Sequence, residues 1–275
     1  KNKIPFIPGL EACGLIIEQN CSKPSLLGKK VIIYRKNGCY AEEVISNTDE
    51  LIFIKKDVKN DVAAGFYIAY LTAYISLREI AKARKGQSIL ITGASGGIGN
   101  AIVLLSKYIG LNIYAITSSV EKMKTLKKLG VKNCVLENDN LKDALMKLSF
   151  NKELDIVADV SGLQKKYNLL SCLKWQGKYL ILGFMENNIS FIKTNYVLIK
   201  GLKIYGVRAG EYLRKNRKRK KTIIKDLKKL LEANINLKSK HTFFEFNQLK
   251  KGLSLMNNRQ SSGKIIIKTK YFTEN

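Results

Sequence analysis

The sequence predicts an α/β fold in which a doubly wound parallel sheet is joined to a partial β-barrel. From residue 87 to about residue 207, short Val/Ile/Leu-rich runs alternate with helical segments, which is the pattern of a parallel sheet covered on both faces. The first 60 residues instead form short strand-like runs separated by glycines and prolines, which is typical of an antiparallel β domain.

The N-terminal part is expected to hold strands at residues 14–18, 30–35, 40–45 and 51–54. A helix is expected over about 62–81. The longest stretch without charge, from Val62 to Leu77, lies in this helix and is shorter than the roughly 20 apolar residues that cross a bilayer. We therefore interpret it as a buried helix and expect no membrane span.

The parallel sheet is expected to use strands at residues 88–92, 112–116, 134–136, 155–159, 179–182 and 203–207. Helices are expected at 98–109, 121–129, 140–148 and 165–173, followed by a helix at 222–234 and a strand at 264–268. These elements divide the chain into three parts, at 1–68, 69–208 and 209–275.

Composition and charge limit the possible functions. Of 275 residues, 45% are hydrophobic, which excludes a disordered chain, and the five cysteines include no C-x-x-C pair. A reduced, cytoplasmic compartment is expected; because the chain starts at Lys1 without Met, a targeting segment is not excluded. The net charge is +27, and residues 201–275 hold 20 basic and 5 acidic residues. A polyanionic partner, an anionic cofactor and a lysine-rich solvated surface all remain open as explanations.

The most informative motif is the glycine-rich loop that follows the strand at 88–92. Its sequence from Thr92 to Gly99 is Thr-Gly-Ala-Ser-Gly-Gly-Ile-Gly, and an apolar helix follows. Gly96 lets the backbone approach a pyrophosphate, and Gly99 lets the helix pack close to the strand. The motif predicts a dinucleotide site; the alternative is a tight strand–helix turn without a ligand.

The end of the second strand favours NADPH (NADP+) over NADH. An NAD site usually places Asp or Glu there, whereas this chain has Thr117, Ser118 and, one helical turn on, Lys122. Hydroxyl groups and a lysine suit a ribose 2′-phosphate. A solvated helix position is the alternative for Lys122.

Several motifs in order resemble the zinc-independent quinone oxidoreductase (zeta-crystallin-like) branch of the medium-chain dehydrogenase/reductase family. They are Pro-Phe-Ile-Pro-Gly-Leu-Glu at 5–11, Gly-Cys-Tyr-Ala-Glu at 38–42, Ala-Tyr-Leu-Thr-Ala-Tyr at 69–74, the glycine loop, Asp-Ile-Val-Ala-Asp at 155–159, Gly-Lys-Tyr-Leu-Ile-Leu-Gly-Phe at 177–184, Asn-Tyr at 195–196 and Ser-Gly-Lys-Ile at 262–265. The resemblance implies a Rossmann dinucleotide-binding domain at 69–208 and a GroES-like β-barrel domain at 1–68, which holds the substrate and to which the chain returns at 209–275. It also implies that the N-terminal strands of that barrel are missing, so that the chain is N-terminally truncated.

The resemblance implies hydride transfer from NADPH to a quinone or an α,β-unsaturated carbonyl. Zinc-dependent relatives have a His where this chain has Leu10, and their other ligand aligns with Ala64. The sole histidine, His241, lies far along the chain and is expected to be an ordinary packing or surface residue. We therefore expect no metal site.

The resemblance also assigns candidate site residues. Those for the cofactor are Ser95, Gly96, Gly97, Ile98 and Gly99 at the pyrophosphate, Ser118 and Lys122 at the 2′-phosphate, Ser161, Leu182, Gly183 and Phe184 at the ribose and nicotinamide, and Arg259 at the adenosine phosphate. Tyr70 and Thr72 are the candidate catalytic groups, with core packing as their alternative. An exposed surface position is the alternative for Arg259. The strand at 203–207 resembles the one that pairs across a two-fold axis, which implies a homodimer.

Two further functions stay open. Seven of the eight residues at 214–221 are basic, and crystallin-like members of the family are associated with RNA binding, so a non-catalytic nucleotide- or RNA-binding protein is one alternative. However, no aromatic or glycine residue interrupts that run to stack on bases, which favours a solvated surface. The other alternative is an acyl-CoA enoyl reductase of the same fold.

Overall fold

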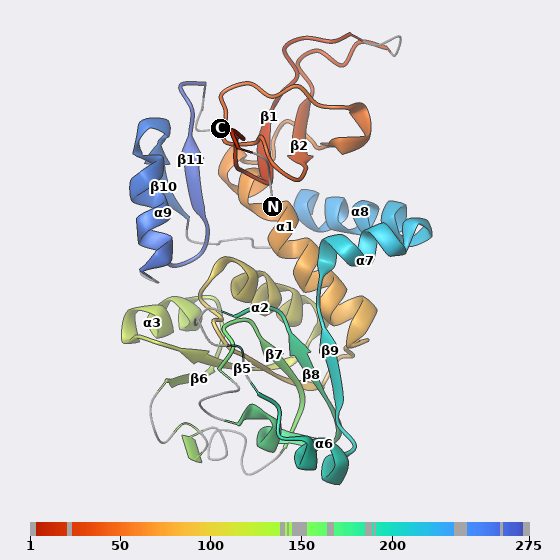
Figure 1. Ribbon diagram of the computed structural model, residues 1–275, viewed down its shortest axis with the longest axis vertical. Helices are drawn as coiled ribbons and strands as arrows, with labels where there is room; N and C mark the ends of the chain where they lie inside the picture. Colours follow the sequence, from red (N-terminus) through yellow and green to blue (C-terminus); the bar gives the residue numbers. More distant parts are fainter. Residues whose placement is uncertain are drawn as a thin grey trace. The chain divides into compact units, whose positions relative to one another are not determined.

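The computed structural model describes residues 4–20, 24–137, 141, 143–144, 153–163, 168–184, 189, 191–233, 241–258 and 261–271 (Figure 1). The chain divides into two compact units. One consists of Lys1–Ala69 together with Lys218–Asn275, and the other of Tyr70–Arg217.

The second unit is built on a six-stranded parallel sheet. Its strands are β4 (Ser88–Ile91), β5 (Asn112–Thr117), β6 (Asn133–Leu136), β7 (Leu154–Asp159), β8 (Leu173–Ile181) and β9 (Lys203–Gly206). The spatial order is β6-β5-β4-β7-β8-β9, and every neighbouring pair is parallel. The chain order reverses between β4 and β7, which is the switch point where ligands bind in such sheets. The predicted fold class is confirmed.

Helices and turns precede, connect and follow these strands. They are α1 (Asn60–Tyr74), which continues into a π-helical segment at Ile75–Ile80, α2 (Gly97–Ile109), α3 (Val120–Lys128), a 3₁₀ turn at Leu169–Cys172, α6 (Thr194–Lys200) and α7 (Ala209–Lys215). Ser119 caps α3 by accepting a hydrogen bond from the Lys122 backbone N–H. Gly110, at the end of α2, adopts the left-handed conformation that closes many helices.

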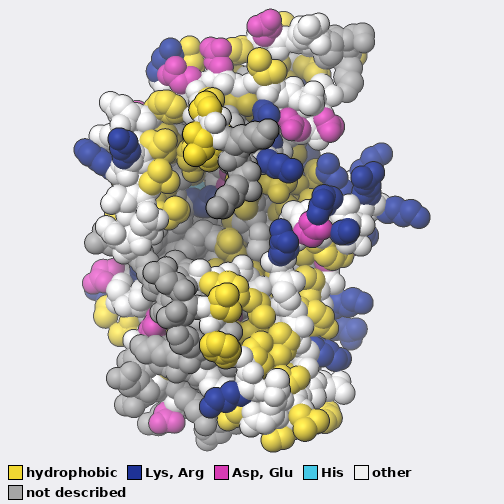
Figure 2. All heavy atoms as spheres, viewed as in Figure 1, with side chains coloured by type: hydrophobic (Ala, Val, Ile, Leu, Met, Phe, Trp, Pro, Cys, Tyr) yellow, Lys and Arg dark blue, Asp and Glu magenta, His cyan; other side chains and the backbone are white. Residues whose placement is uncertain are grey.

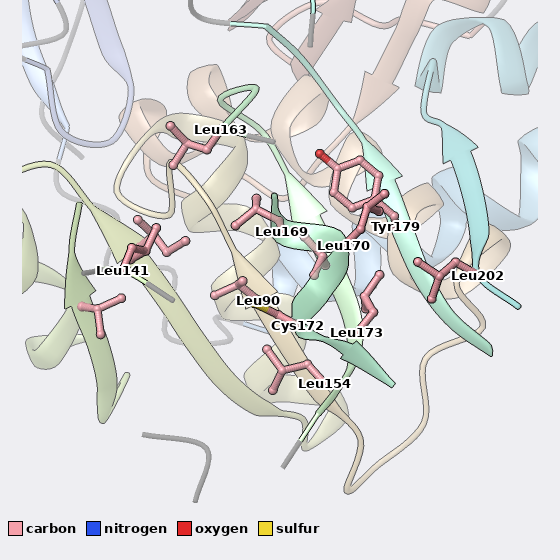
Figure 3. Close-up of a cluster of buried hydrophobic side chains, with 13 residues drawn as sticks. Leu90, Leu141, Leu154, Leu163, Leu169, Leu170, Cys172, Leu173, Tyr179 and Leu202 are labelled. Carbon is pink, nitrogen blue, oxygen red and sulfur yellow. The ribbon is translucent and has the colours of Figure 1, made fainter. Parts of the chain in front are cut away.

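One apolar cluster of the second unit lies between the sheet strands and the segments that cover them (Figure 3). Leu90, Ile116, Val157 and Tyr179 come from four different strands and are all at most 2% exposed. Tyr196 and Val197 of α6 pack against the same cluster. This packing holds the strands at the switch point in a fixed register.

The first unit combines both ends of the chain. An antiparallel sheet contains β1 (Glu11–Leu15), β2 (Lys30–Tyr34) and β3 (Leu51–Phe53), while β10 (Thr242–Glu245) pairs in parallel with β11 (Ile265–Lys268). The helices of the C-terminal part are α8 (Arg217–Glu232) and α9 (Leu249–Asn257). The Glu11 carboxylate joins the two ends: it accepts a hydrogen bond from the Ile68 backbone N–H at 2.9 Å and pairs with the Lys264 Nζ at 2.5 Å.

Two predicted elements are wrong. Residues 40–45 form no strand, because the Tyr40 and Cys39 N–H groups donate to the Pro8 and Gly9 carbonyls and bend the chain around that turn. The described end of the predicted helix at 165–173 forms a 3₁₀ turn, and β8 already begins at Leu173. The predicted helix at 140–148 lies largely outside the described residues, and α6, α7 and α9 were not predicted.

No helix within the described ranges is long and apolar enough to cross a membrane. Cys13, Cys39, Cys134 and Cys172 are free thiols.

Candidate dinucleotide-binding site

The glycine loop joins β4 to α2 at the switch point. Gly96 occupies the N-cap of α2 with extended backbone angles and offers no capping side chain, and its own N–H donates to the Gly93 carbonyl at 3.0 Å. The first backbone N–H groups of a helix have no intrahelical acceptor and carry the positive end of the helix dipole. An uncapped start at this place therefore suits an anionic group.

Two glycines of the loop have different structural roles. A Cβ on Gly99 would stand 2.2 Å from the Gly93 carbonyl oxygen and 2.7 Å from the Ala94 Cα, so no side chain fits there. A Cβ on Gly96 would meet only the Gly93 oxygen, at 3.4 Å. Gly99 is thus required for the packing of α2, whereas the missing side chain of Gly96 keeps the approach to the helix N-terminus open.

The loops after β4, β7 and β8 meet at this edge of the sheet. A Cβ on Gly93 would lie 3.5 Å from the Ser161 Cβ, and one on Gly162 would lie 3.4 Å from the Phe184 Cα. A Cβ on Gly183 would lie 3.0 Å from the Val160 carbonyl oxygen. The loop after β7 therefore lies between the glycine loop, which Ser161 approaches, and the loop after β8, which carries Gly183 and Phe184.

Two hydroxyl groups near the strand ends are buried and have no hydrogen-bond partner among the described residues. They are Ser161 Oγ, after β7, and Thr117 Oγ1, at the end of β5. Burying a hydroxyl without a partner costs free energy that a bound polar ligand would recover. The orphaned Ser161 oxygen and the open glycine loop together fit a dinucleotide.

Ser118 lies in the loop after β5 and contacts Lys122 in the first turn of α3. The Lys122 Nζ is 3.4 Å from the Ser118 Oγ, and Ser118 is exposed. A lysine ammonium and a hydroxyl on one surface turn form a donor set that suits a phosphate monoester.

For the remaining predicted site residues that lie in the described ranges, the structure gives burial and backbone contacts. Ser95 is buried, Leu182 is half-buried and donates its N–H to the Asp159 carbonyl, and Arg259 lies outside the described residues. Tyr70 and Thr72 are buried on α1, and the Thr72 carbonyl accepts a hydrogen bond from Ser76. Their catalytic role stays a prediction.

The sequence did not single out Thr92 and Asp159 as functional. Thr92 follows β4 directly and Asp159 ends β7, and their side chains form a 2.6 Å hydrogen bond at the switch point. The only available signal was a polar residue at the end of each strand, because the sequence does not show that the two strands are neighbours.

The described residues at the two positions that hold zinc in zinc-dependent relatives offer no side-chain ligand. Leu10 and Ala64 carry no donor atom, and His241 packs close to Gly65, Lys264 and Ile266. In the part of the chain that the structure describes, no three His, Cys, Asp or Glu side chains come together to hold a metal ion.

Known proteins are similar to this chain in sequence and fold. A family model described as zinc-binding dehydrogenase matches residues 97–229. A quinone oxidoreductase-like protein 2 homolog of Nematostella vectensis is 27% identical over 98% of this chain and 75% of that protein. The quinone oxidoreductase-like protein 2 of Rattus norvegicus is 28% identical, and the match covers 77% of this chain and 61%, less than two thirds, of that protein.

Among solved structures, the Escherichia coli quinone oxidoreductase complexed with NADPH superposes with a TM-score of 0.86 at 18% identity, covering 97% of this chain and 83% of that one. At that identity the likeness shows the fold alone. Residues 97–229 therefore form a zinc-binding dehydrogenase domain of the medium-chain dehydrogenase/reductase superfamily, and the chain has quinone oxidoreductase-like relatives.

Proposed function

We propose that this chain is an NADPH-dependent oxidoreductase that transfers hydride to a quinone or an α,β-unsaturated carbonyl without a catalytic zinc. The observation that carries the proposal is the uncapped N-terminus of α2, reached from β4 through a loop that Gly96 leaves open. The quinone oxidoreductase-like relatives support the reaction class.

The preference for NADPH is supported by Ser118 and Lys122. Their 3.4 Å contact places a cation and a hydroxyl beyond β5, where an NAD site would carry a carboxylate. The E. coli relative with this fold is complexed with NADPH. We assign Ser118 and Lys122 to the 2′-phosphate.

In the proposed mechanism, the bound cofactor supplies the hydride. The start of α2, with Ser95 to Gly99, binds the pyrophosphate through backbone N–H groups and the helix dipole. The loops that carry Ser161 and Leu182–Phe184 hold the ribose and nicotinamide and limit the access of water. Tyr70 and Thr72 are the candidate donors to the oxyanion that forms on the acceptor.

Two alternatives are tested alongside this function. The basic residues at 214–221 lie at the end of α7 and the start of α8, and Figure 2 shows Lys and Arg side chains gathered there. Such a surface would attract the phosphates of an enoyl-CoA ester or of RNA. The proposal instead treats it as a solvated surface.

The test is steady-state oxidation of NADPH by the purified chain with a quinone, an alkenal and an enoyl-CoA ester as acceptors. We expect turnover with the quinone or the alkenal. Turnover with the CoA ester alone would favour the enoyl reductase. Binding of RNA at physiological salt, with no turnover of any acceptor, would favour the non-catalytic alternative.

We also propose a homodimer formed through β9. This strand lies at the edge of the described sheet, so one side of its backbone is available to a strand of a second copy. Light scattering should give twice the chain mass at micromolar concentration; the mass of a single chain would contradict the proposal.

A further inference from the structure

Thr92 holds the loop that follows β7. Its side chain is fully buried, and its Oγ1 donates to the Asp159 Oδ1 at 2.6 Å. The same oxygen accepts from the backbone N–H groups of Val160 and Ser161 at 2.9 and 3.1 Å. One hydroxyl directly before the glycine loop therefore fixes the backbone of the loop after the neighbouring strand.

Asp159 fixes the next two residues of that loop. Its side chain is 2% exposed, and Oδ1 also accepts from the Gly162 and Leu163 N–H groups at 2.9 and 3.2 Å. The Tyr179 hydroxyl of β8 donates to Oδ2 at 2.5 Å. Burial and the nearby Asp159 carboxylate raise the pKa of Tyr179, so Tyr179 remains a hydroxyl donor.

The two side chains together bind four successive backbone N–H groups, from residue 160 to residue 163. A buried carboxylate is costly unless several donors satisfy it, and core packing alone would be served by an apolar residue. The polar pair instead determines where the loop lies relative to the glycine loop.

The position of Ser161 depends on this pair. The Ser161 backbone N–H donates a hydrogen bond to the Thr92 Oγ1, and the Ser161 Cβ is 3.5 Å from where a Cβ of Gly93 would stand. The buried Ser161 Oγ has no hydrogen-bond partner among the described residues. A dinucleotide whose pyrophosphate lies on the glycine loop has its nicotinamide half beyond the pyrophosphate. The orphaned hydroxyl is therefore available to that half.

We propose that Thr92 and Asp159 are positioning residues that hold Ser161 against the glycine loop and thereby place the nicotinamide half of the cofactor for hydride transfer. This inference rests on the proposed function. Because a displacement of about 1 Å can cost on the order of 100-fold in rate, loss of the Thr92 hydroxyl should affect turnover more than folding.

The decisive variants are Thr92→Val, which keeps the shape and removes the oxygen, and Thr92→Ser, which keeps the oxygen. Ser106→Ala is the matched control, because Ser106 is buried in α2 and its hydroxyl has no partner among the described residues. Two ligands are compared by calorimetry: NADPH, and adenosine 2′,5′-bisphosphate, which contains only the adenine half.

For Thr92→Val we expect unchanged affinity for the bisphosphate, about 10-fold weaker affinity for NADPH, and a kcat reduced by on the order of 100-fold. Thr92→Ser should retain the wild-type NADPH affinity and kcat, and so should Ser106→Ala. If Thr92→Val fails to fold, Tyr179→Phe is the second variant, because it removes only the hydroxyl that donates to the Asp159 Oδ2. It should show the same selective loss of NADPH affinity at a smaller magnitude.

Wild-type values for NADPH affinity and kcat in a folded Thr92→Val variant would overturn the inference. An equal loss of affinity for NADPH and for the bisphosphate would also overturn it. If only Tyr179→Phe folds, wild-type values in that variant would overturn it. A wild-type chain that binds neither ligand would overturn the proposed function and this inference with it.

Discussion

Gly99 lies directly against Gly93, at a distance that admits no side chain: a Cβ on Gly99 would stand 2.2 Å from the Gly93 carbonyl oxygen. The obstacle is backbone and cannot rotate away. Through this contact, the first turn of α2 packs directly against the loop that follows β4. The contact therefore fixes the direction in which the helix N-terminus points. The proposed pyrophosphate site depends on that direction.

The two glycines predict opposite outcomes for two alanine substitutions. Gly99→Ala should lower the free energy of unfolding by about 3 kcal/mol, because the added methyl group overpacks against backbone. Gly96→Ala should unfold close to the wild type, since its Cβ would have a single contact at 3.4 Å, but should bind NADPH more weakly. Urea unfolding and calorimetry check both. Equal stability of the two variants would refute the assigned roles.

Glu11 should stabilise the first unit through its two partners. Glu11→Ala leaves the Lys264 ammonium without its carboxylate and should cost about 2 kcal/mol. Glu11→Gln keeps an acceptor for the Ile68 N–H and should cost about half as much. Glu18→Ala, at an exposed position, is the control for urea unfolding. A loss no larger than that of the control would contradict the role of Glu11.

His241 should titrate below its ordinary range. Burial lowers the pKa of its imidazole, the Asp61 carboxylate raises it and Lys264 lowers it further, with a net decrease from 6.5. The folded chain therefore binds a proton on His241 less readily than the unfolded chain. The contribution to stability is complete above about pH 6.5 and is lost as the pH falls toward the folded pKa.

Because His241 is the sole histidine, its NMR signals give this pKa directly. We expect a midpoint below 6.5 and, for His241→Gln, a smaller loss of stability than in the wild type when the pH falls from about 7.5 to about 5.5. A midpoint at or above 6.5 would show that the imidazole is better solvated or more strongly paired with Asp61 than its surroundings indicate.

Local patterns were sufficient for the glycine loop. The apolar run of β4, the loop glycines and the amphipathic start of α2 are adjacent in sequence, and each is a signal that does not depend on distant contacts. The predicted helix at 165–173 shows the limit of such patterns. Leu169, Leu170 and Leu173 have helical spacing, yet all three are buried in a turn and a strand start, which spacing alone cannot distinguish in a short apolar run.

Long-range contacts account for what the sequence did not reveal. The bend at Tyr40 arises from hydrogen bonds to Pro8 and Gly9, about 30 residues earlier. Similarly, Thr92 and Asp159 are 67 residues apart and meet only because β4 and β7 are neighbours at the switch point. The sequence identified each strand end, but the pairing of those ends required the strand order.

The most direct test of the central claim is the affinity of the wild-type chain for NADPH and NADH, measured by calorimetry and repeated with Lys122→Met. The account predicts at least about 10-fold tighter binding of NADPH, equivalent to about 1.4 kcal/mol. Lys122→Met should remove most of this preference without changing the NADH affinity, whereas Lys124→Met, at an exposed position of the same helix, should preserve it. Equal affinity for the two dinucleotides, or no binding of either by a folded chain, would contradict the account.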